Sequence, residues 1–196
     1  MITRILLLSL FTFLVPLLAD KLFIDNEKVV MEKAAVKMEK ISDELREKTD
    51  YKIYISAKET INGQSITKYS QELAKKLEAP YVLITFASVE EQIELVMSEG
   101  LEKILDKDDI LDDSIIPLFV EHRKDITKST QYSAGLFNGL SVISDKLALS
   151  KGVVLEHSVG NGTETFMDGL GWIIRILLLA TLVAMFIAYR KSQKGA

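Results

Sequence analysis

Cysteine is absent from this 196-residue chain, which also has only two histidines and three prolines. Without cysteine there can be no disulfide, no thiolate metal site and no cysteine nucleophile. The two histidines, His122 and His157, fall in different predicted segments, so the sequence does not favour a histidine metal site or a paired acid and base. These absences remove several common catalytic arrangements.

Several sequence motifs of enzymes are missing as well. The chain has no nucleophile elbow, no glycine-rich phosphate loop and no dinucleotide-binding fingerprint. The formal net charge is −4, and the strongest basic cluster is the short C-terminal tail, so no nucleic-acid partner is expected. The groups that remain available for chemistry are mainly carboxylates.

Apolar residues concentrate at the two ends of the chain. Residues 1–19 combine an early Arg4 with an apolar core and a final small Ala19, which predicts a signal peptide or an uncleaved N-terminal anchor. Residues 170–189 include the run WIIRILLLATLVAMFIAY, close to the about 20 apolar residues that a membrane-spanning helix requires. The sequence therefore predicts a membrane-anchored protein.

The charges that flank the C-terminal span predict its orientation. Residues 190–196 are basic, which places this tail in the cytoplasm. Residues 20–150 are then an extracytoplasmic domain, periplasmic outside a cell (inner) membrane, and residues 151–169 are its linker. Trp172 is expected at the membrane interface. Arg175 either extends to that interface or pairs with an acid of a partner membrane protein.

Hydrophobic periodicity predicts the elements of the middle region. Spacings of three and four predict helices over 25–48, from Ser65 or Thr67 to 78, over 108–124 and over 129–149. Apolar and alternating runs predict strands over 52–57, 81–87 and 92–97. The last two strands are too close in sequence for a crossover and should form an antiparallel hairpin. The predicted fold is α/β, a small mixed β-sheet sandwiched by α-helices.

Two glycines in the last predicted helix, Gly135 and Gly139, lie four residues apart. Residues at this spacing share one face of a helix, so we expect another element to pack closely there.

The stretch SEGLEKILDKDDILDD, residues 98–113, is the most acidic in the chain. Two interpretations of its second half remain open. Carboxylates can supply the oxygen ligands of a hard cation such as calcium. Alternatively, acids at the start of a helix cap its free N–H groups and interact favourably with its dipole. In the first half, Gly100 is expected at a bend, with Leu101 and Leu105 in the core.

Residues 22–149 resemble a TPM domain in the order and spacing of several motifs. KTDYKIYIS is similar to the family's passage from helix to strand, and YVLITFASVEEQIELVMSEGLEKIL to its strand, turn, strand and G-Y-G-L-E segment. YSAGLFNGLSVISDKLA resembles its closing Y-x-x-G-L-x-x-G-x-x-x-L helix. A signal peptide before the domain and a membrane span after it also resemble bacterial members.

The resemblance implies a compact α/β sandwich, and members are described as calcium binders, weak acid phosphatases or accessory factors of membrane complexes. The metal ligands suggested by the acidic residues and the resemblance are Asp25, Asp106, Asp108 and Asp109. The chain departs from the family pattern in two places: the family's D-N-G is Glu78-Ala79-Pro80 here, and the Asp of its L-T-D is Lys107. Two acidic ligands of the family pattern are thus missing or shifted.

Two functional hypotheses follow. The first is a non-enzymatic, membrane-anchored extracytoplasmic module that docks on, or helps assemble, another membrane or envelope protein, with calcium as a candidate ligand. The alternative is a metal-dependent acid phosphatase of the TPM type, in which a metal activates water without a histidine.

Overall fold

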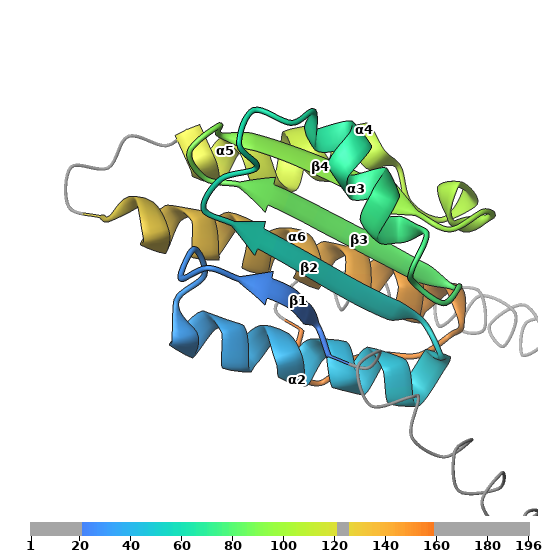
Figure 1. Ribbon diagram of the computed structural model, residues 1–196. Coiled ribbons are helices and arrows are strands. Elements are labelled where there is room, and N and C mark those ends of the chain that lie inside the picture. The colour runs from blue at the N-terminus through green and yellow to red at the C-terminus, as the bar shows by residue number, and fades with distance from the viewer. Residues whose placement is uncertain (1–20, 121–125, 159–196) are drawn as a thin grey trace, which may run out of the picture. The chain divides into compact units, whose positions relative to one another are not determined.

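The computed structural model describes residues 21–120 and 126–158 (Figure 1). The chain divides into two units, Met1–Gly160 and Asn161–Ala196, and all described residues belong to the first. The predicted signal peptide or anchor, the predicted span with Trp172 and Arg175, and the basic tail lie outside the described residues. Within the two described ranges, no helix combines the length and the apolar character needed to cross a membrane.

A four-stranded mixed sheet forms the centre of the first unit. Its strands follow chain order: β1 (Phe23–Asn26), β2 (Lys52–Lys58), β3 (Tyr81–Ala87) and β4 (Gln92–Met97). β1, β2 and β3 are parallel, whereas β4 runs antiparallel to β3. The predicted mixed sheet and hairpin are confirmed, because the short link after β3 leaves no room for a crossover.

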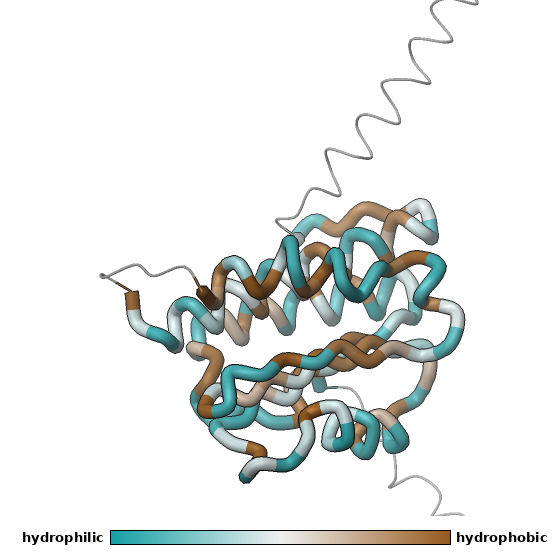
Figure 2. The backbone as a smooth tube through the Cα atoms, turned by 90° about the horizontal axis from the view of Figure 1, so that it is seen from above, coloured by the Kyte–Doolittle hydropathy of each residue, from teal (hydrophilic) through white to brown (hydrophobic). Residues whose placement is uncertain are grey.

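Helices cover both faces of this sheet, as Figure 2 shows from above. α2 (Glu32–Thr49) and α6 (Lys128–Ser150) pack against each other on one face. α3 (Ile66–Ala74) packs on β3 and β4 from the other face. Short helices follow β4: η1 (Leu101–Lys103), α4 (Lys107–Asp109), the π-helical η2 (Ile110–Ile115) and α5 (Ile116–Val120).

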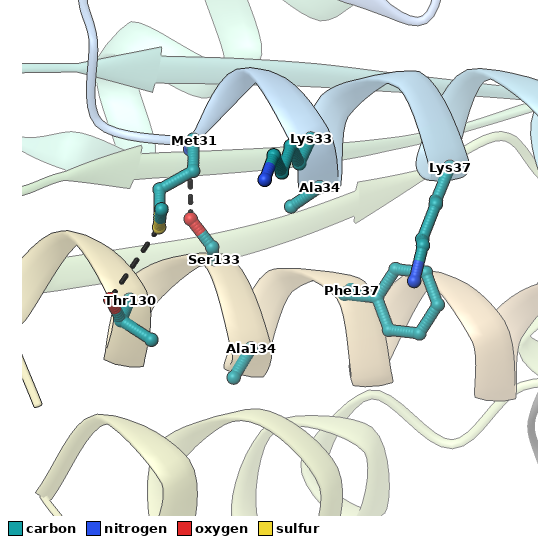
Figure 3. Close-up of a pocket in the computed structure, with 8 residues that line it drawn as sticks. All are labelled: Met31, Lys33, Ala34, Lys37, Thr130, Ser133, Ala134 and Phe137. Carbon is teal, nitrogen blue, oxygen red and sulfur yellow. Dashed lines mark hydrogen bonds between the residues drawn. The ribbon is translucent and has the colours of Figure 1, made fainter.

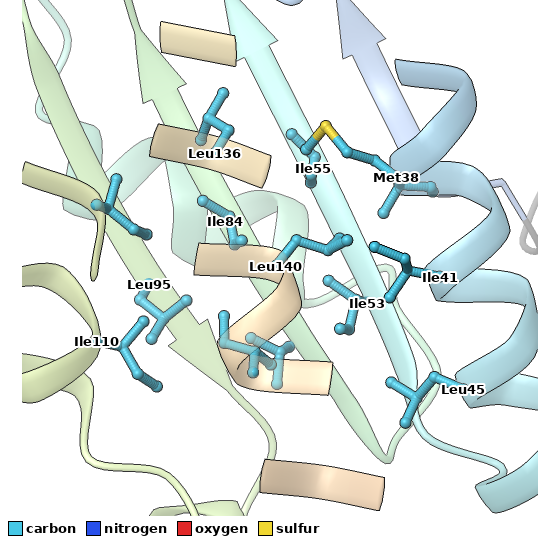
Figure 4. Close-up of a cluster of buried hydrophobic side chains, with 14 of the residues drawn as sticks. Met38, Ile41, Leu45, Ile53, Ile55, Ile84, Leu95, Ile110, Leu136 and Leu140 are labelled. Atoms are coloured by element: carbon cyan, nitrogen blue, oxygen red, sulfur yellow. The ribbon is translucent and has the colours of Figure 1, made fainter. Parts of the chain in front are cut away.

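The main hydrophobic core lies between the sheet and the pair formed by α2 and α6 (Figure 4). Its buried side chains come from both helices and three strands and include Met38, Ile41, Leu45, Leu136, Leu140, Ile53, Ile55, Ile84 and Leu95. Because side chains alternate along a strand, Tyr54 of β2 points to the opposite face, where it packs in a smaller cluster with Leu83 and Ala74. Leu101 and Leu105 are buried, as predicted.

The chain before α2 differs from the prediction. The sequence pattern predicts a helix from residue 25, but β1 occupies that position and the helix begins at Glu32. β1 pairs with β2 at the edge of the sheet, a tertiary contact that helical periodicity does not reveal. Asn26 then turns the chain, because its side chain accepts a hydrogen bond from the Val30 N–H and donates one to the Val30 carbonyl.

The helix predicted over 108–124 is present as an unbroken helical run from Lys107 to Val120, but its middle is π-helical. α4, η2 and α5 follow one another up to Val120, and residues 121–125 lie outside the described ranges. Pro117 offers the physical reason, since its ring has no N–H and would collide with the carbonyl four residues earlier in a regular α-helix. A wider π turn relieves that collision. Asn138 of α6 donates to the Ser114 carbonyl in this stretch at 2.8 Å.

Gly135 and Gly139 confirm the predicted close packing. A Cβ atom at Gly139 would overlap the side chain of Ile115. A Cβ atom at Gly135 would overlap the Phe119 ring and press on the Ile115 carbonyl oxygen at 3.0 Å. These glycines therefore let η2 and α5 lie directly against α6.

Residues 151–158, which we term the strap, fold back against α2 after the end of α6. Leu155 is buried, and the Lys48 ammonium donates to the Val154 carbonyl at 3.2 Å. The Ser158 hydroxyl donates to Asp145 of α6 at 2.7 Å. The first part of the predicted linker thus packs on the domain.

Candidate functional site

The acids predicted as metal ligands fall in two separate places. Asp25 is half-buried on β1 and accepts a hydrogen bond from Ser56 of β2, with 3.4 Å between the oxygens. Asp106, Asp108 and Asp109 lie at the start of α4, which follows β4 in the chain. β1 and β4 are the two edges of the sheet, so three strand spacings, about 14 Å, separate these edges.

The distance between these acids decides whether they can bind the same calcium ion. Calcium holds its oxygen ligands at about 2.3–2.6 Å, so carboxylates at opposite edges of a sheet cannot share one ion. Within residues 21–120 and 126–158, no group of three or more acidic or histidine side chains is arranged to hold a metal. The donor set of the described domain does not fit the calcium site that the resemblance suggests.

Asp106 instead caps the start of α4. Its Oδ1 accepts hydrogen bonds from the backbone N–H groups of Asp108 and Asp109, at 2.9 and 3.2 Å. The side chains of Asp108 and Asp109 are exposed in the first turn, where negative charge interacts favourably with the helix dipole. These contacts agree with the second interpretation of the acidic stretch, in which its acids cap the start of a helix and interact with the helix dipole.

Lys107 has a role that sequence reasoning missed. Its ammonium forms an ion pair with Glu94 of β4, a largely buried carboxylate whose other oxygen accepts from Thr67 of α3 at 2.8 Å. Burial alone would raise the pKa of Glu94, but the hydrogen bonds from Lys107 and Thr67 outweigh it, and the pKa is lowered. The only sequence signal was the departure of Lys107 from the family pattern.

A cleft opens at the carboxyl ends of the parallel strands, the edge where ligands commonly bind to α/β sheets. Its volume is about 640 Å³. Its polar lining includes Glu27, Lys28, Glu59, Lys128 and Tyr132. Its position makes this cleft a candidate binding site. Whether it can bind a ligand or act in catalysis depends on which of its charged groups are already held in ion pairs.

Two charged residues that line this cleft, Glu27 and Lys128, form ion pairs with neighbouring side chains. Lys58 forms an ion pair with Glu27, and Lys128 forms one with Glu91. The Tyr132 hydroxyl donates to Glu91 at 3.3 Å. The hydrogen bond from Lys58 lowers the pKa of Glu27. Because a carboxyl that acts as a general acid near neutral pH needs a raised pKa, Glu27 is poorly suited to that role.

A second depression lies between α2 and α6, and we call it the α2–α6 groove (Figure 3). Its volume is about 350 Å³. The residues that line it are Met31, Lys33, Ala34, Lys37, Thr130, Ser133, Ala134 and Phe137. Its surface is mainly apolar, and Ala34 and Ala134 contribute only methyl groups to it. Space that a larger side chain would fill therefore stays open between the two helices.

Hydrogen bonds between the helices fix one end of the α2–α6 groove. The Met31 N–H donates to the Ser133 hydroxyl at 2.9 Å, and that hydroxyl donates to the Ser129 carbonyl at 2.6 Å. The Thr130 hydroxyl contacts the Met31 sulfur at 3.5 Å (Figure 3). Met31 is 43% exposed, so its flexible, polarizable side chain is accessible at the mouth of the groove.

The charged residues that line the α2–α6 groove are Lys33 and Lys37, both exposed and one turn apart on α2. No acid lines it. Within the described part of the chain these two ammonium groups form no ion pair, whereas Lys48 on the same helix pairs with Glu44. The groove is thus apolar with a positive rim on one side.

A family model and solved structures are similar to this chain. The sequence model of the TPM domain matches residues 23–146. The N-terminal domain of a protein from P. gingivalis, solved by NMR, superposes with a TM-score of 0.58 at 18% identity, over 72% of this chain and 88% of that one. The BA42 protein of the psychrophilic bacterium Bizionia argentinensis matches with a TM-score of 0.45 at 14% identity, over 70% and 97%. Among curated proteins no match was found.

Proposed function

Because the chain belongs to the TPM domain family, through a domain that spans residues 23–146, we propose that it is a membrane-anchored accessory factor. In this proposal residues 1–19 export the chain and residues 170–189 anchor it in the cell membrane. The TPM domain lies on the extracytoplasmic side, docks on another membrane or envelope protein and assists its assembly. Trp172 and Arg175 contact the membrane or the partner's span.

The α2–α6 groove is the observation that carries this proposal. Apolar surface that is rimmed by polar groups commonly marks a protein interaction site. The groove lies between two helices whose opposite sides already pack on the sheet, so a partner can bind there without a change in the core. Among its lining residues, the hydroxyls of Ser133 and Thr130 already take part in contacts between the helices. These features suit binding better than catalysis.

The alternative, a metal-dependent acid phosphatase, has weaker support. Such an enzyme needs carboxylates that converge on a metal and its water. Asp25 instead lies on edge strand β1, whereas Asp106 caps α4, which the Lys107–Glu94 ion pair joins to the other edge strand, β4. At the strand ends, Glu27 and Glu91 are paired with lysines. The purified full-length chain in detergent should therefore not hydrolyse p-nitrophenyl phosphate above background when calcium or magnesium is supplied. Turnover that disappears in Asp25→Asn would favour the phosphatase instead.

Photocrosslinking in intact membranes tests the accessory role. A photoreactive amino acid is placed in the full-length chain at Ala134 in the groove, at Lys75 beyond α3, and at Val89 in the link between β3 and β4, all of which are exposed. We expect one defined membrane or envelope protein to be captured repeatedly. Capture of only abundant background proteins from all three positions would contradict the proposal.

A further inference from the structure

We propose that the α2–α6 groove binds an amphipathic helical segment of a partner protein, in which an apolar side chain is flanked by acidic residues. This inference rests on the proposed function as an accessory factor and adds the chemistry of the partner. It is carried by the shape of the groove and by the signs of the charges around it.

The shape and the apolar lining of the groove favour the insertion of an apolar side chain of the partner, which we call the anchor. Ala34 and Ala134 face the open space with methyl groups, and Phe137 adds an aromatic surface. A single leucine- or phenylalanine-sized side chain inserted there would remove apolar surface of both molecules from water, which is the main favourable term in association. Met31 at the mouth can adapt its side chain to such an anchor.

The positive charges beside the groove favour a partner with acidic residues next to its apolar anchor. Lys33 and Lys37 are the charged lining residues, and α6 carries no charged residue between Lys128 and Asp145. Figure 3 shows that both lysines project from α2. A chain with a formal net charge of −4 therefore presents a locally positive docking surface, whose complement is negative.

The spacing of the lysines favours a helix as the occupant. Residues four apart on α2 lie one turn apart along its axis, about 6 Å. A partner helix that lies along the groove can present two acids at the same spacing, with its apolar stripe directed between α2 and α6. The chain's own C-terminal tail is a poor occupant, because its Arg190, Lys191 and Lys194 have the same sign as the rim.

Peptide binding tests the chemistry directly. The probes are two short synthetic helical peptides with the same leucine stripe, one flanked by glutamates and the other by lysines, and fluorescence anisotropy measures their binding to the full-length chain in detergent. We expect the glutamate peptide to bind more tightly. The double substitution Lys33→Gln and Lys37→Gln should weaken it about fivefold, as the loss of two exposed ion pairs would. Ala134→Leu, which fills the groove, should weaken both peptides.

The matched control is Lys75→Gln with Lys76→Gln, which removes the same charge from exposed positions beyond α3. This variant should bind the glutamate peptide like the unchanged chain. Equal affinity for the two peptides, equal effects of the two double variants, or no effect of Ala134→Leu would overturn the inference. Circular dichroism spectra identical to the unchanged chain would show that the variants are folded.

Crosslinks from position 134 in membranes give an independent test. Mass spectrometry should place them on a segment of another protein that has acids within one turn of an apolar residue. Crosslinks to lipid or to a second copy of this chain would overturn the inference. If only the photoreactive positions at 75 or 89 capture a defined protein, this inference fails but the accessory role stands. If no position captures one, both fail.

Discussion

The Glu44 carboxylate of α2 holds His157, 113 residues later in the chain: its Oε2 accepts from the His157 N–H at 3.0 Å and lies 2.8 Å from the ring Nδ1. Its Oε1 accepts from the Glu156 N–H and from the Lys48 ammonium, each at 2.7 Å. One nearly buried carboxylate thus fastens the strap to α2. Burial alone would raise the pKa of Glu44, but the hydrogen bonds from Lys48, Glu156 and His157 lower it to about 2.

Glu44→Gln should destabilise the domain. Each carboxylate oxygen of Glu44 accepts hydrogen bonds, one from Lys48 and Glu156 and the other from His157. In glutamine one of these oxygens is replaced by an NH₂ group, which cannot accept them, and the negative charge is lost. We expect a loss of about 2 kcal/mol in the free energy of unfolding, since hydrogen bonds to a charged group are involved. Urea unfolding of residues 20–160, followed by circular dichroism, measures it. Glu47→Gln, an exposed acid on the same helix, is the control and should change stability by less than about 0.5 kcal/mol.

The contribution of Glu44 should depend on pH. Its folded-state pKa of about 2 lies below the ordinary value of 4.5, so the ionised carboxylate stabilises the fold fully above pH 4.5. That contribution is lost as the pH falls from there toward the folded-state pKa. The stability difference between the unchanged domain and Glu44→Gln should therefore be largest near neutral pH and shrink as the pH falls from 4.5 toward about 2. A difference that stays constant over this range would contradict the assignment.

Glu94 and Lys107 should be energetically coupled. Lys107→Met leaves a largely buried carboxylate without its counter-ion, and Glu94→Gln removes the charge that Lys107 meets. We expect the double variant to be less destabilised than the sum of the two single variants, by more than about 0.5 kcal/mol. A double-mutant cycle by urea unfolding measures this coupling. Strictly additive effects would show that the ion pair contributes nothing to the fold.

Gly139→Ala should destabilise the domain although alanine favours helices. The new Cβ would overlap Ile115 of η2, and overpacking of this kind costs about 1–3 kcal/mol. The gain in helix propensity is at most about 1 kcal/mol. The reverse substitution at an exposed site of α6, Ala134→Gly, measures that propensity term in the same helix. A thermally stabilised Gly139→Ala variant would mean that η2 does not pack closely on α6.

Asp106 should behave as a helix cap. Asp106→Ala removes the acceptor for the Asp108 and Asp109 N–H groups and should cost about 1 kcal/mol. Asp106→Asn retains an acceptor oxygen and should cost much less. Chemical unfolding of both variants, with and without added calcium, separates capping from metal binding. A loss that appears only when calcium is present would indicate a ligand role instead.

Much of the sheet could be predicted from local pattern. The continuous apolar run of β3 and the four residues before β4 led directly to an antiparallel hairpin, and the structure has it. β1 could not be found in this way, because four residues next to an amphipathic helix carry too little periodicity. The π-helical middle of the helix predicted over 108–124 depends on Pro117, whose effect on helix type the periodicity does not reveal.

The candidate sites were harder to predict. Asp25 and Asp106 are equivalent in sequence as carboxylates. Only the tertiary structure puts Asp25 on edge strand β1 and Asp106 at the start of α4, beside the other edge strand. Lys107 was visible as a departure from a family pattern, but its partner Glu94 was not. The α2–α6 groove has no sequence signature, since alanines at facing positions create it only when the two helices lie side by side.

The sequence by itself determined which faces of each element are apolar, where turns occur and which catalytic groups are missing. It could do so because burial of apolar surface is the main driving force and acts on local periodic patterns. The tertiary structure alone decided which charges meet, where the strap is fastened and where an apolar groove remains open. Those features depend on atoms that are distant in the chain, and a hydrogen bond or an ion pair exists only when the fold brings both partners within a few ångströms.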